Sequence, residues 1–386
     1  MCGRQKENKG KKQRHLTTAV GDVAFVRRYW KCVCGSGGSY AVDAVLGVEG
    51  ERSTKTVQKH LCRLSADTAF ASASEHMHEM LGVKLCPETV RRVVERHGKK
   101  MARFQEEDTA SEQAFREAPG EVEFTIDAGK ANTREEGWKD LKIGVIAKRE
   151  SGKPTKLDDY KKQHLPAATM VLAFAMIAPS KEFRQGWRER FKRLGVTSMA
   201  SIHVLADGAN WIWKAVGRVL TGCVQTLDFY HACQHLNKCA ERIHGERIHG
   251  ERIHGERVSK TCATSIAYRR GRSLLLSQGW GGVCQWVAEL LAATDSTDVA
   301  DEKRRRKATD RMIGYFSKHL SRLNYAERLG AGRAIGSGQV EGQAKTLGLR
   351  LKLRGARWNK KNVRPMASLV CVRHSSQWAA YWQMAA

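Results

Sequence analysis

The sequence has no apolar run long enough to cross a lipid bilayer. Its longest apolar stretch, Met170 to Pro179, is far shorter than the roughly 20 residues that a membrane-spanning helix needs. The N-terminal segment is basic and lacks the hydrophobic region of a secretory signal. The 11 cysteines show no spacing typical of a disulfide framework, which predicts reduced thiols. These absences predict a cytoplasmic protein without a membrane partner.

Acidic residues are also scarce relative to basic ones. The chain has 67 Lys+Arg against 40 Asp+Glu, a net charge of +27, and a pI of about 9.9. Residues 301–386 alone hold 19 Lys+Arg and 5 Asp+Glu. Because each neutralised phosphate releases counterions, such an excess favours binding to a polyanion. We therefore expect a nucleic-acid partner, the alternative being a merely solvated basic surface.

The N-terminal part is expected to bind DNA. Residues 1–27 are polar and basic, which predicts a disordered tail, and residues 28–115 form the expected DNA-binding region. Within it, a helical stretch at 66–81 and a second one at 87–98, which begins with a proline, predict a helix-turn-helix. A small basic helical hairpin without DNA recognition is the alternative. The residues expected to face the major groove are Arg91, Arg92, Arg96 and Lys99.

One close cysteine pair stands in this region. Cys32 and Cys34 form a C-x-C motif, whereas a structural zinc site usually has two close Cys or His pairs. We therefore expect no structural Zn²⁺. Plain buried thiols or an incomplete zinc ribbon explain the pair better.

Residues 116–232 alternate between strand and helix patterns. Three strand candidates are followed by helix, strand, helix and strand, an order that matches an RNase H-like α/β layout with a mixed sheet. In that layout the first and fourth strands are neighbours. The strand candidates are 121–127, 141–149, 169–178, 201–207 and 223–229.

The rest of the chain is expected to be helical. Residues 233–332 predict a helical insertion domain, and residues 333–386 predict C-terminal helices of the core. The insertion contains ERIHG three times over residues 241–255. A five-residue period does not keep one face of a helix, so the repeat predicts a surface loop or helix extension.

Three carboxylates are the main candidates for a catalytic, metal-binding site. Asp127 and Asp207 each close a β-branched apolar run, and Glu341 follows a Gly-Ser-Gly turn at the start of a helix. Three such carboxylates can hold two Mg²⁺ or Mn²⁺ ions about 3.5–4 Å apart, the arrangement used in phosphodiester chemistry. Asp228 also ends a strand and rivals Asp207. With His231 it is expected to support the site or cap the next helix.

Two further groups of residues are expected near the site. Trp211 and Trp213 could stack on an unpaired base near the cut or belong to the core, and both interpretations stay open here. Basic residues after Glu341 are expected to follow the phosphate backbone of DNA. They are Lys345, Arg350, Lys352, Arg354 and Arg357.

Several motifs together resemble one family. TIDAGK, VLADGANWIWKAV, LDFYHACQHL and GSGQVEGQAKTLGLRLK, with the terminal QWAAYW, are similar to the DDE transposases of bacterial insertion sequences, specifically the ISKra-type family. The resemblance covers roughly residues 28–386. It implies that Asp127, Asp207 and Glu341 form a metal-binding catalytic triad in an RNase H-like core interrupted by a helical insertion.

The resemblance also implies a function. Such a protein binds the terminal inverted repeats of its element as a homodimer or larger assembly, cleaves the DNA, and joins its ends to target DNA. This chain departs from the family in its incomplete cysteine pattern and its expanded ERIHG repeat. Two alternatives remain: a non-catalytic DNA-binding protein, either decayed or domesticated, and an RNase H-like nuclease that does not join strands.

Overall fold

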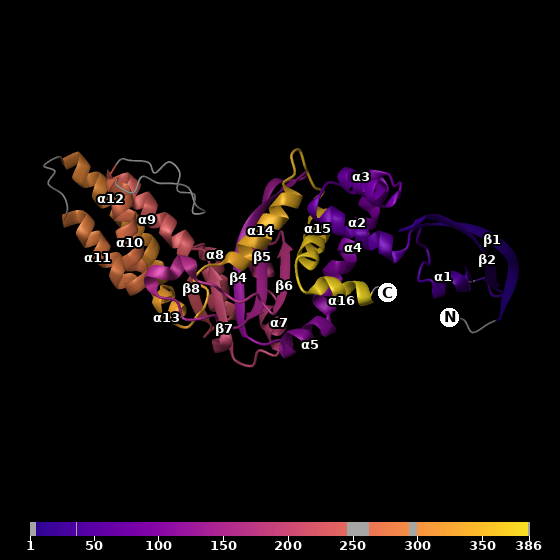
Figure 1. Cartoon of the computed structure of the whole chain (residues 1–386), viewed down its shortest axis with the longest axis horizontal. Helices are drawn as coiled ribbons and strands as arrows, with labels where there is room; N and C mark the ends of the chain where they lie inside the picture. The colour runs from indigo at the N-terminus through magenta and orange to yellow at the C-terminus, as the bar shows by residue number, and fades with distance from the viewer. Residues whose placement is uncertain (1–4, 36, 245–261, 293–298, 385–386) are drawn as a thin grey trace.

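The protein is a mixed α/β molecule with two β-sheets and many helices. The computed structural model describes residues 5–35, 37–244, 262–292 and 299–384. A five-stranded sheet lies in the middle, between a group of helices at one end and an N-terminal β-ribbon at the other (Figure 1). None of the helices described is long and apolar enough to cross a membrane.

The N-terminal ribbon replaces the expected disordered tail. β1 (Lys6–Thr18) and β2 (Gly21–Cys32) pair antiparallel, and the short β3 (Gly38–Ser39) adds to β2. The prediction of disorder over residues 1–27 was therefore wrong for the described part of this segment. Most of β1 is exposed, so its polar, lysine-rich composition is compatible with a strand and gave no apolar alternation to detect.

A buried ion pair fastens this ribbon to the short helix α1 (Ala41–Val45). Arg14 of β1 and Arg27 of β2 both contact the carboxylate of Asp43, which is 3% exposed. Arg14 also donates to the carbonyl oxygen of Val48 at 2.6 Å. A buried carboxylate needs such partners, so these contacts fix the base of the ribbon.

Four helices lead from the ribbon to the central sheet. They are α2 (Lys55–Asp67), α3 (Phe70–Leu81), α4 (Pro87–Glu107) and α5 (Thr109–Glu117). The helix expected at 87–98 begins at Pro87 as predicted but does not end at Gly98. A Cβ on Gly98 would lie 2.5 Å from the carbonyl oxygen of Pro365. Gly98 therefore permits close packing of α4 on α15 (Lys360–Arg373) and does not end a helix.

The central sheet has the predicted five strands. They are β4 (Glu121–Thr133), β5 (Gly137–Arg149), β6 (Met170–Met176), β7 (Ile202–Ala206) and β8 (Val224–Leu227). Their order is β6-β5-β4-β7-β8. β4 pairs antiparallel with β5 and parallel with β7, and β7 pairs parallel with β8. The sheet is therefore mixed, as predicted.

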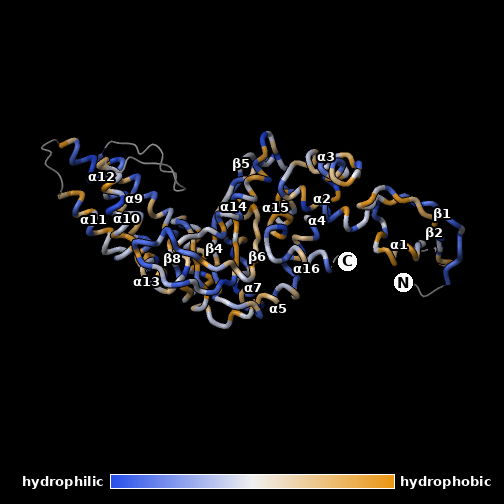
Figure 2. The backbone as a smooth tube through the Cα atoms, viewed as in Figure 1, coloured by the Kyte–Doolittle hydropathy of each residue, from blue (hydrophilic) through white to orange (hydrophobic). Residues whose placement is uncertain are grey.

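Helices cover both faces of this sheet. One hydrophobic cluster joins Phe124 and Val204 of the sheet to α7 (Trp187–Arg193) and α8 (Asn210–Val219). The other joins Ile143 to α14 (Gly338–Leu351), α15 (Lys360–Arg373) and the N-terminal helices. Figure 2 shows hydrophobic residues along the central strands and α15. Because side chains alternate along β4, Asp127 lies on the face opposite Phe124, which is the α14 face.

Helices fill the described chain between β8 and α14, where a helical insertion was expected. The long helices of this segment are α9 (Phe229–His244), α10 (Ala263–Gln278), α11 (Trp280–Ala292) and α12 (Val299–Phe316). The first ERIHG copy begins at the end of α9, and the rest of the repeat lies outside the described residues. Shorter elements complete the fold: η1 (Leu157–Lys162), α6 (Ser180–Phe183), η2 (Met199–Ser201), η3 (Ser317–Arg322), α13 (Tyr325–Gly330) and α16 (Gln377–Met384).

Candidate active site

Asp127 and Asp207 lie on neighbouring strands. β4 and β7 run parallel, with Ile126 opposite Ala206. The residues that follow this pair are Asp127 and Asp207. Asp207 follows the last residue of β7, as predicted. Asp127 does not end its strand, because β4 continues to Thr133 by pairing with β5.

Glu341 completes this group from the first turn of α14. Burial raises the pKa of Asp127 to about 6, and the nearby negative charges of Asp207 and Glu341 raise it as well. The backbone N–H of Ala128, which donates to Asp127 Oδ1 at 2.7 Å, and the charge of His231 oppose this rise. Asp207 and Glu341 are therefore close enough to Asp127 to influence its ionisation.

Asp228 is fully buried and joins three elements. It follows β8, and its backbone N–H donates to the carbonyl oxygen of Ala206 at 2.7 Å. Its Oδ2 accepts from the N–H of Ser337 at 2.5 Å and from the Ser337 hydroxyl at 2.8 Å. Its Oδ1 accepts from the backbone N–H of His231 at 2.7 Å. Burial alone would raise the pKa of Asp228, but the hydrogen bonds from His231 and Ser337 hold it below its usual value.

These bonds give Asp228 a supporting position. Ser337 precedes α14, so Asp228 ties the start of the helix that carries Glu341 to the end of β8. The same carboxylate caps the first turn of α9 through the His231 N–H. This geometry favours Asp207 over Asp228 as the second carboxylate of the site.

His231 lies between two carboxylates. Its Nδ1 is 3.1 Å from Asp228 Oδ1 and 3.7 Å from Glu341 Oε1. The hydrogen bond with Asp228 raises the pKa of His231 to about 9, and the charges of Glu341 and Asp207 add to this rise. The ring is therefore a cation at neutral pH, directly beside the catalytic candidate Glu341.

Within the described ranges, Asp228, His231 and Glu341 are also a group whose ligand atoms lie within 4.8 Å of one another. Asp228 could bind a cation only by giving up its bonds to Ser337 and His231. The carboxylate oxygens of Asp127, Asp207 and Glu341 are hard ligands of the kind that divalent cations prefer. These three residues remain the predicted metal-ligand set.

Neither Trp211 nor Trp213 is an exposed ring on which a base could stack without rearrangement. Trp213 is buried, its Nε1 donates to the backbone oxygen of Asp207 at 2.7 Å, and the Arg322 guanidinium lies 4.3 Å from its ring. Trp211 is half-buried, with the Lys142 ammonium 5.1 Å from its ring. Trp213 therefore belongs to the core and positions the Asp207 backbone.

Sequence reasoning missed Tyr315. This residue of the helical insertion lies so near the Asp207 loop that a Cβ on Gly208 would be 2.4 Å from its hydroxyl oxygen. Its ring stacks on His235 with centroids 3.6 Å apart. Burial raises the pKa of Tyr315, as do the charges of Asp207 and Asp228. Gly208, directly after Asp207, was the one sign in the sequence that another side chain packs closely against this position.

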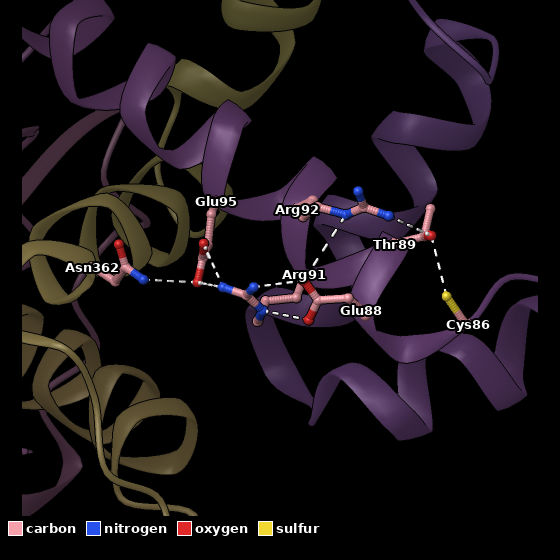
Figure 3. Close-up of polar contacts among 7 residues, drawn as sticks. All are labelled: Cys86, Glu88, Thr89, Arg91, Arg92, Glu95 and Asn362. Carbon is pink, nitrogen blue, oxygen red and sulfur yellow. Dashed lines mark hydrogen bonds and ion pairs between the residues drawn. The ribbon is translucent and has the colours of Figure 1, made fainter.

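The expected recognition helix α4 is only partly free to contact DNA. Arg91 is held between Glu88 and Glu95 (Figure 3), and Arg96 donates to Glu51. One face of α4 is buried against α15 and the neighbouring helices. Two predicted contacts on this helix remain exposed: Arg92 and Lys99.

Among the basic residues after Glu341, Arg350 departs from the prediction. It is 2% exposed, its Nε donates to the Ser65 carbonyl oxygen at 2.6 Å, and its guanidinium lies 4.6 Å from the Phe70 ring and 4.8 Å from the Trp358 ring. The expectation of an exposed backbone contact was wrong for this residue. The other four are exposed as expected: Lys345, Lys352, Arg354 and Arg357.

The cysteine pair of the N-terminal ribbon is close in space. The Sγ atoms of Cys32 and Cys34 are 2.9 Å apart. The other nearby candidate ligand in sequence, Cys2, lies outside the described residues.

Comparison with known proteins adds one finding. Residues 4–127 match the model of UPF0236, an uncharacterised protein family. The UPF0236 match spans the ribbon, the N-terminal helices and β4 as far as Asp127, so Asp207 and Glu341 lie beyond it. No curated protein matches the chain. The description of UPF0236 assigns no activity, and a functional proposal must rest on the site.

Proposed function

We propose that this protein is a DDE transposase that cleaves DNA at the ends of an insertion sequence and joins those ends to target DNA. The observation that carries the proposal is the convergence of Asp127, Asp207 and Glu341 from β4, β7 and α14. The strand order β6-β5-β4-β7-β8, with only β5 antiparallel to its two neighbours, supports an RNase H-like core.

The donor set fits divalent cations. The negative charges of Asp207 and Glu341 raise the affinity of Asp127 for a proton, and the same charges attract a metal cation. The hard oxygens of the three carboxylates suit Mg²⁺ or Mn²⁺. When bound, two such ions would activate an oxygen nucleophile and stabilise the leaving oxygen of a phosphodiester. Asp127, Asp207 and Glu341 would hold them.

The surrounding residues keep these carboxylates in place. Asp228 holds the start of α14 through Ser337, and Trp213 holds the backbone of Asp207. His231 balances part of the negative charge. Fixing charged groups before the substrate arrives is the main protein contribution to phosphoryl-transfer catalysis.

Charge supports double-stranded DNA as the substrate. The net charge of +27 favours a polyanion, and exposed basic residues follow Glu341 along α14 and its C-terminal loop. Joining two element ends to one target requires at least two active sites, so we infer a dimer or larger assembly on DNA.

The test is a nicking and strand-joining assay on DNA that carries the inverted repeats flanking the gene. We expect cleavage with Mg²⁺ or Mn²⁺, and loss of cleavage with retained DNA binding in Asp127→Asn, Asp207→Asn and Glu341→Gln. The exposed acid Asp310 of α12 provides a matched control, since Asp310→Asn removes the same charge away from the site.

Each outcome of this assay has a distinct meaning. Equal nicking by the native protein and Asp127→Asn would overturn the carboxylate assignment. Nicking without joining would identify a nuclease, and metal-independent binding without any cleavage would identify a non-catalytic DNA-binding protein.

A further inference from the structure

A second charged site lies at the far end of α14. A cleft of about 570 Å³ opens between the α14–α15 loop, α4 and the tip of the β4–β5 hairpin. Arginines dominate its lining, which contains one carboxylate. The arginines are Arg91, Arg134, Arg350, Arg354 and Arg357.

The only acid in the lining is already engaged. Glu95 contacts Arg91 on its own helix and accepts from the side-chain amide of Asn362 at 2.9 Å (Figure 3). By contrast, Arg134, Arg354 and Arg357 are exposed, and no carboxylate of the described chain forms an ion pair with them. The cleft therefore carries uncompensated positive charge.

The buried arginine supplies an independent sign of a missing partner. Arg350 is only 2% exposed, and its Nη2 atom has no hydrogen-bond partner among the described residues. A buried guanidinium N–H without an acceptor is costly. Phe70 and Trp358 hold the guanidinium against the cleft. Because Arg350 lines the cleft, an anion bound there would offset the charge of this buried guanidinium.

The cleft is also well fixed. The Trp358 N–H donates to the Asn132 carbonyl oxygen, and the Arg134 N–H donates to the Trp358 carbonyl oxygen, both at 2.9 Å. The Trp358 indole N–H donates to Leu351 at 3.0 Å. These bonds fasten the arginine-bearing loop to the end of β4, and Asp127 lies on that same strand.

We propose that this cleft binds a backbone phosphate of DNA at a fixed distance from the candidate active site. Asp127 and Thr133 are six residues apart on β4, which corresponds to about 20 Å at roughly 3.3 Å per residue. A duplex running parallel to β4 across the surface of the protein would place this phosphate about six base pairs from the scissile bond, at about 3.4 Å per pair. The distance in base pairs rests on the proposed function, whereas phosphate binding by the cleft does not.

The first experiment measures binding alone. The full chain is titrated with a fluorescent duplex in EDTA at several salt concentrations, using Arg354→Gln/Arg357→Gln against the control Lys303→Gln/Lys307→Gln. This control variant replaces two exposed lysines of α12, which lies in the group of helices at the end of the molecule farthest from the N-terminal ribbon. Losing one phosphate contact should lower the slope of log affinity against log salt by about 0.9. We expect this fall only in the arginine double variant, with recovery in Arg354→Lys/Arg357→Lys.

The second experiment places the phosphate. Single methylphosphonate substitutions are moved along the duplex, and the native protein should lose affinity most when the neutral linkage lies about six nucleotides from the cut. Equal slopes of log affinity against log salt in the arginine and lysine double variants would overturn the proposal that the cleft binds a phosphate, whether or not the protein cuts DNA. If the salt dependence of DNA affinity changes in the arginine double variant but the native protein never cuts DNA, phosphate binding by the cleft would stand and the proposed transposase activity would be rejected.

Discussion

Asp127 is predicted to lower the stability of the metal-free protein. Its carboxylate is half-buried beside two others, which is why its pKa is raised from 3.8 to about 6. Below about pH 3.8 the residue is protonated in both folded and unfolded chains. As the pH rises to about 6, the folded chain keeps a proton that the unfolded chain has released, so stability falls. Above about pH 6 the full loss of stability caused by the raised pKa is present.

The magnitude follows from the shift. A difference of about two pH units at 1.36 kcal/mol each gives at most about 3 kcal/mol of destabilisation. Asp127→Asn removes the charge and keeps the shape, so the metal-free variant should be more stable than the native protein near neutral pH. For a chain of 386 residues this gain corresponds to a melting temperature at most about 3–4 °C higher.

Calorimetry in EDTA checks this prediction. The melting temperature of Asp127→Asn should exceed that of the native protein at about pH 7.5, and the difference should shrink towards zero near pH 4. Added Mg²⁺ should raise the melting temperature of the native protein more than that of the variant, because metal binding offsets the repulsion. A variant that melts below the native protein in EDTA at about pH 7.5 would refute the reasoning.

Three other substitutions test the support of the site. His231→Gln should lower the melting temperature below about pH 6.5, and this deficit should disappear as the pH rises through 9, because the folded pKa of His231 is raised to about 9; a deficit independent of pH would argue against the ion pair. Ser337→Ala removes a donor to buried Asp228 and should cost about 1–3 kcal/mol in calorimetry, with slower cleavage; unchanged values for both would show that this bond does not hold α14. Gly208→Ala would place a Cβ 2.4 Å from Tyr315 and should slow cleavage while leaving DNA binding intact; native rates would mean that Tyr315 yields freely.

The central sheet was predictable because its strands carry a strong local signal. The β-branched apolar runs before Asp127 and Asp207 are buried on both faces, and such runs stand out from their surroundings. Their parallel pairing then followed from the order of strands and helices along the chain. The extension of β4 beyond Asp127 was not predictable, because residues 128–133 are small or polar, carry no β-branched apolar run, and are held by pairing with β5.

Other features depend on contacts that local sequence does not encode. β1 reads as a charged tail because its partner strand, and Asp43 beyond it, supply the interactions that order it. Arg350 looks like any exposed basic residue of α14, yet Ser65 and Phe70, far away in sequence, enclose it. In both cases the deciding partner is distant along the chain, so composition and periodicity point the wrong way.

The helical insertion explains how a carboxylate far along the chain can join the site. The chain leaves the sheet at β8 and returns at Ser337, and Asp228 bonds the two ends of this excursion to each other. The insertion also packs back on the site, since Tyr315 lies against Gly208 and Asn324 accepts from the buried Thr226 hydroxyl at 2.9 Å. The position of Glu341 is therefore set at the base of the insertion. Changes in length that leave this base intact can therefore occur without moving Glu341.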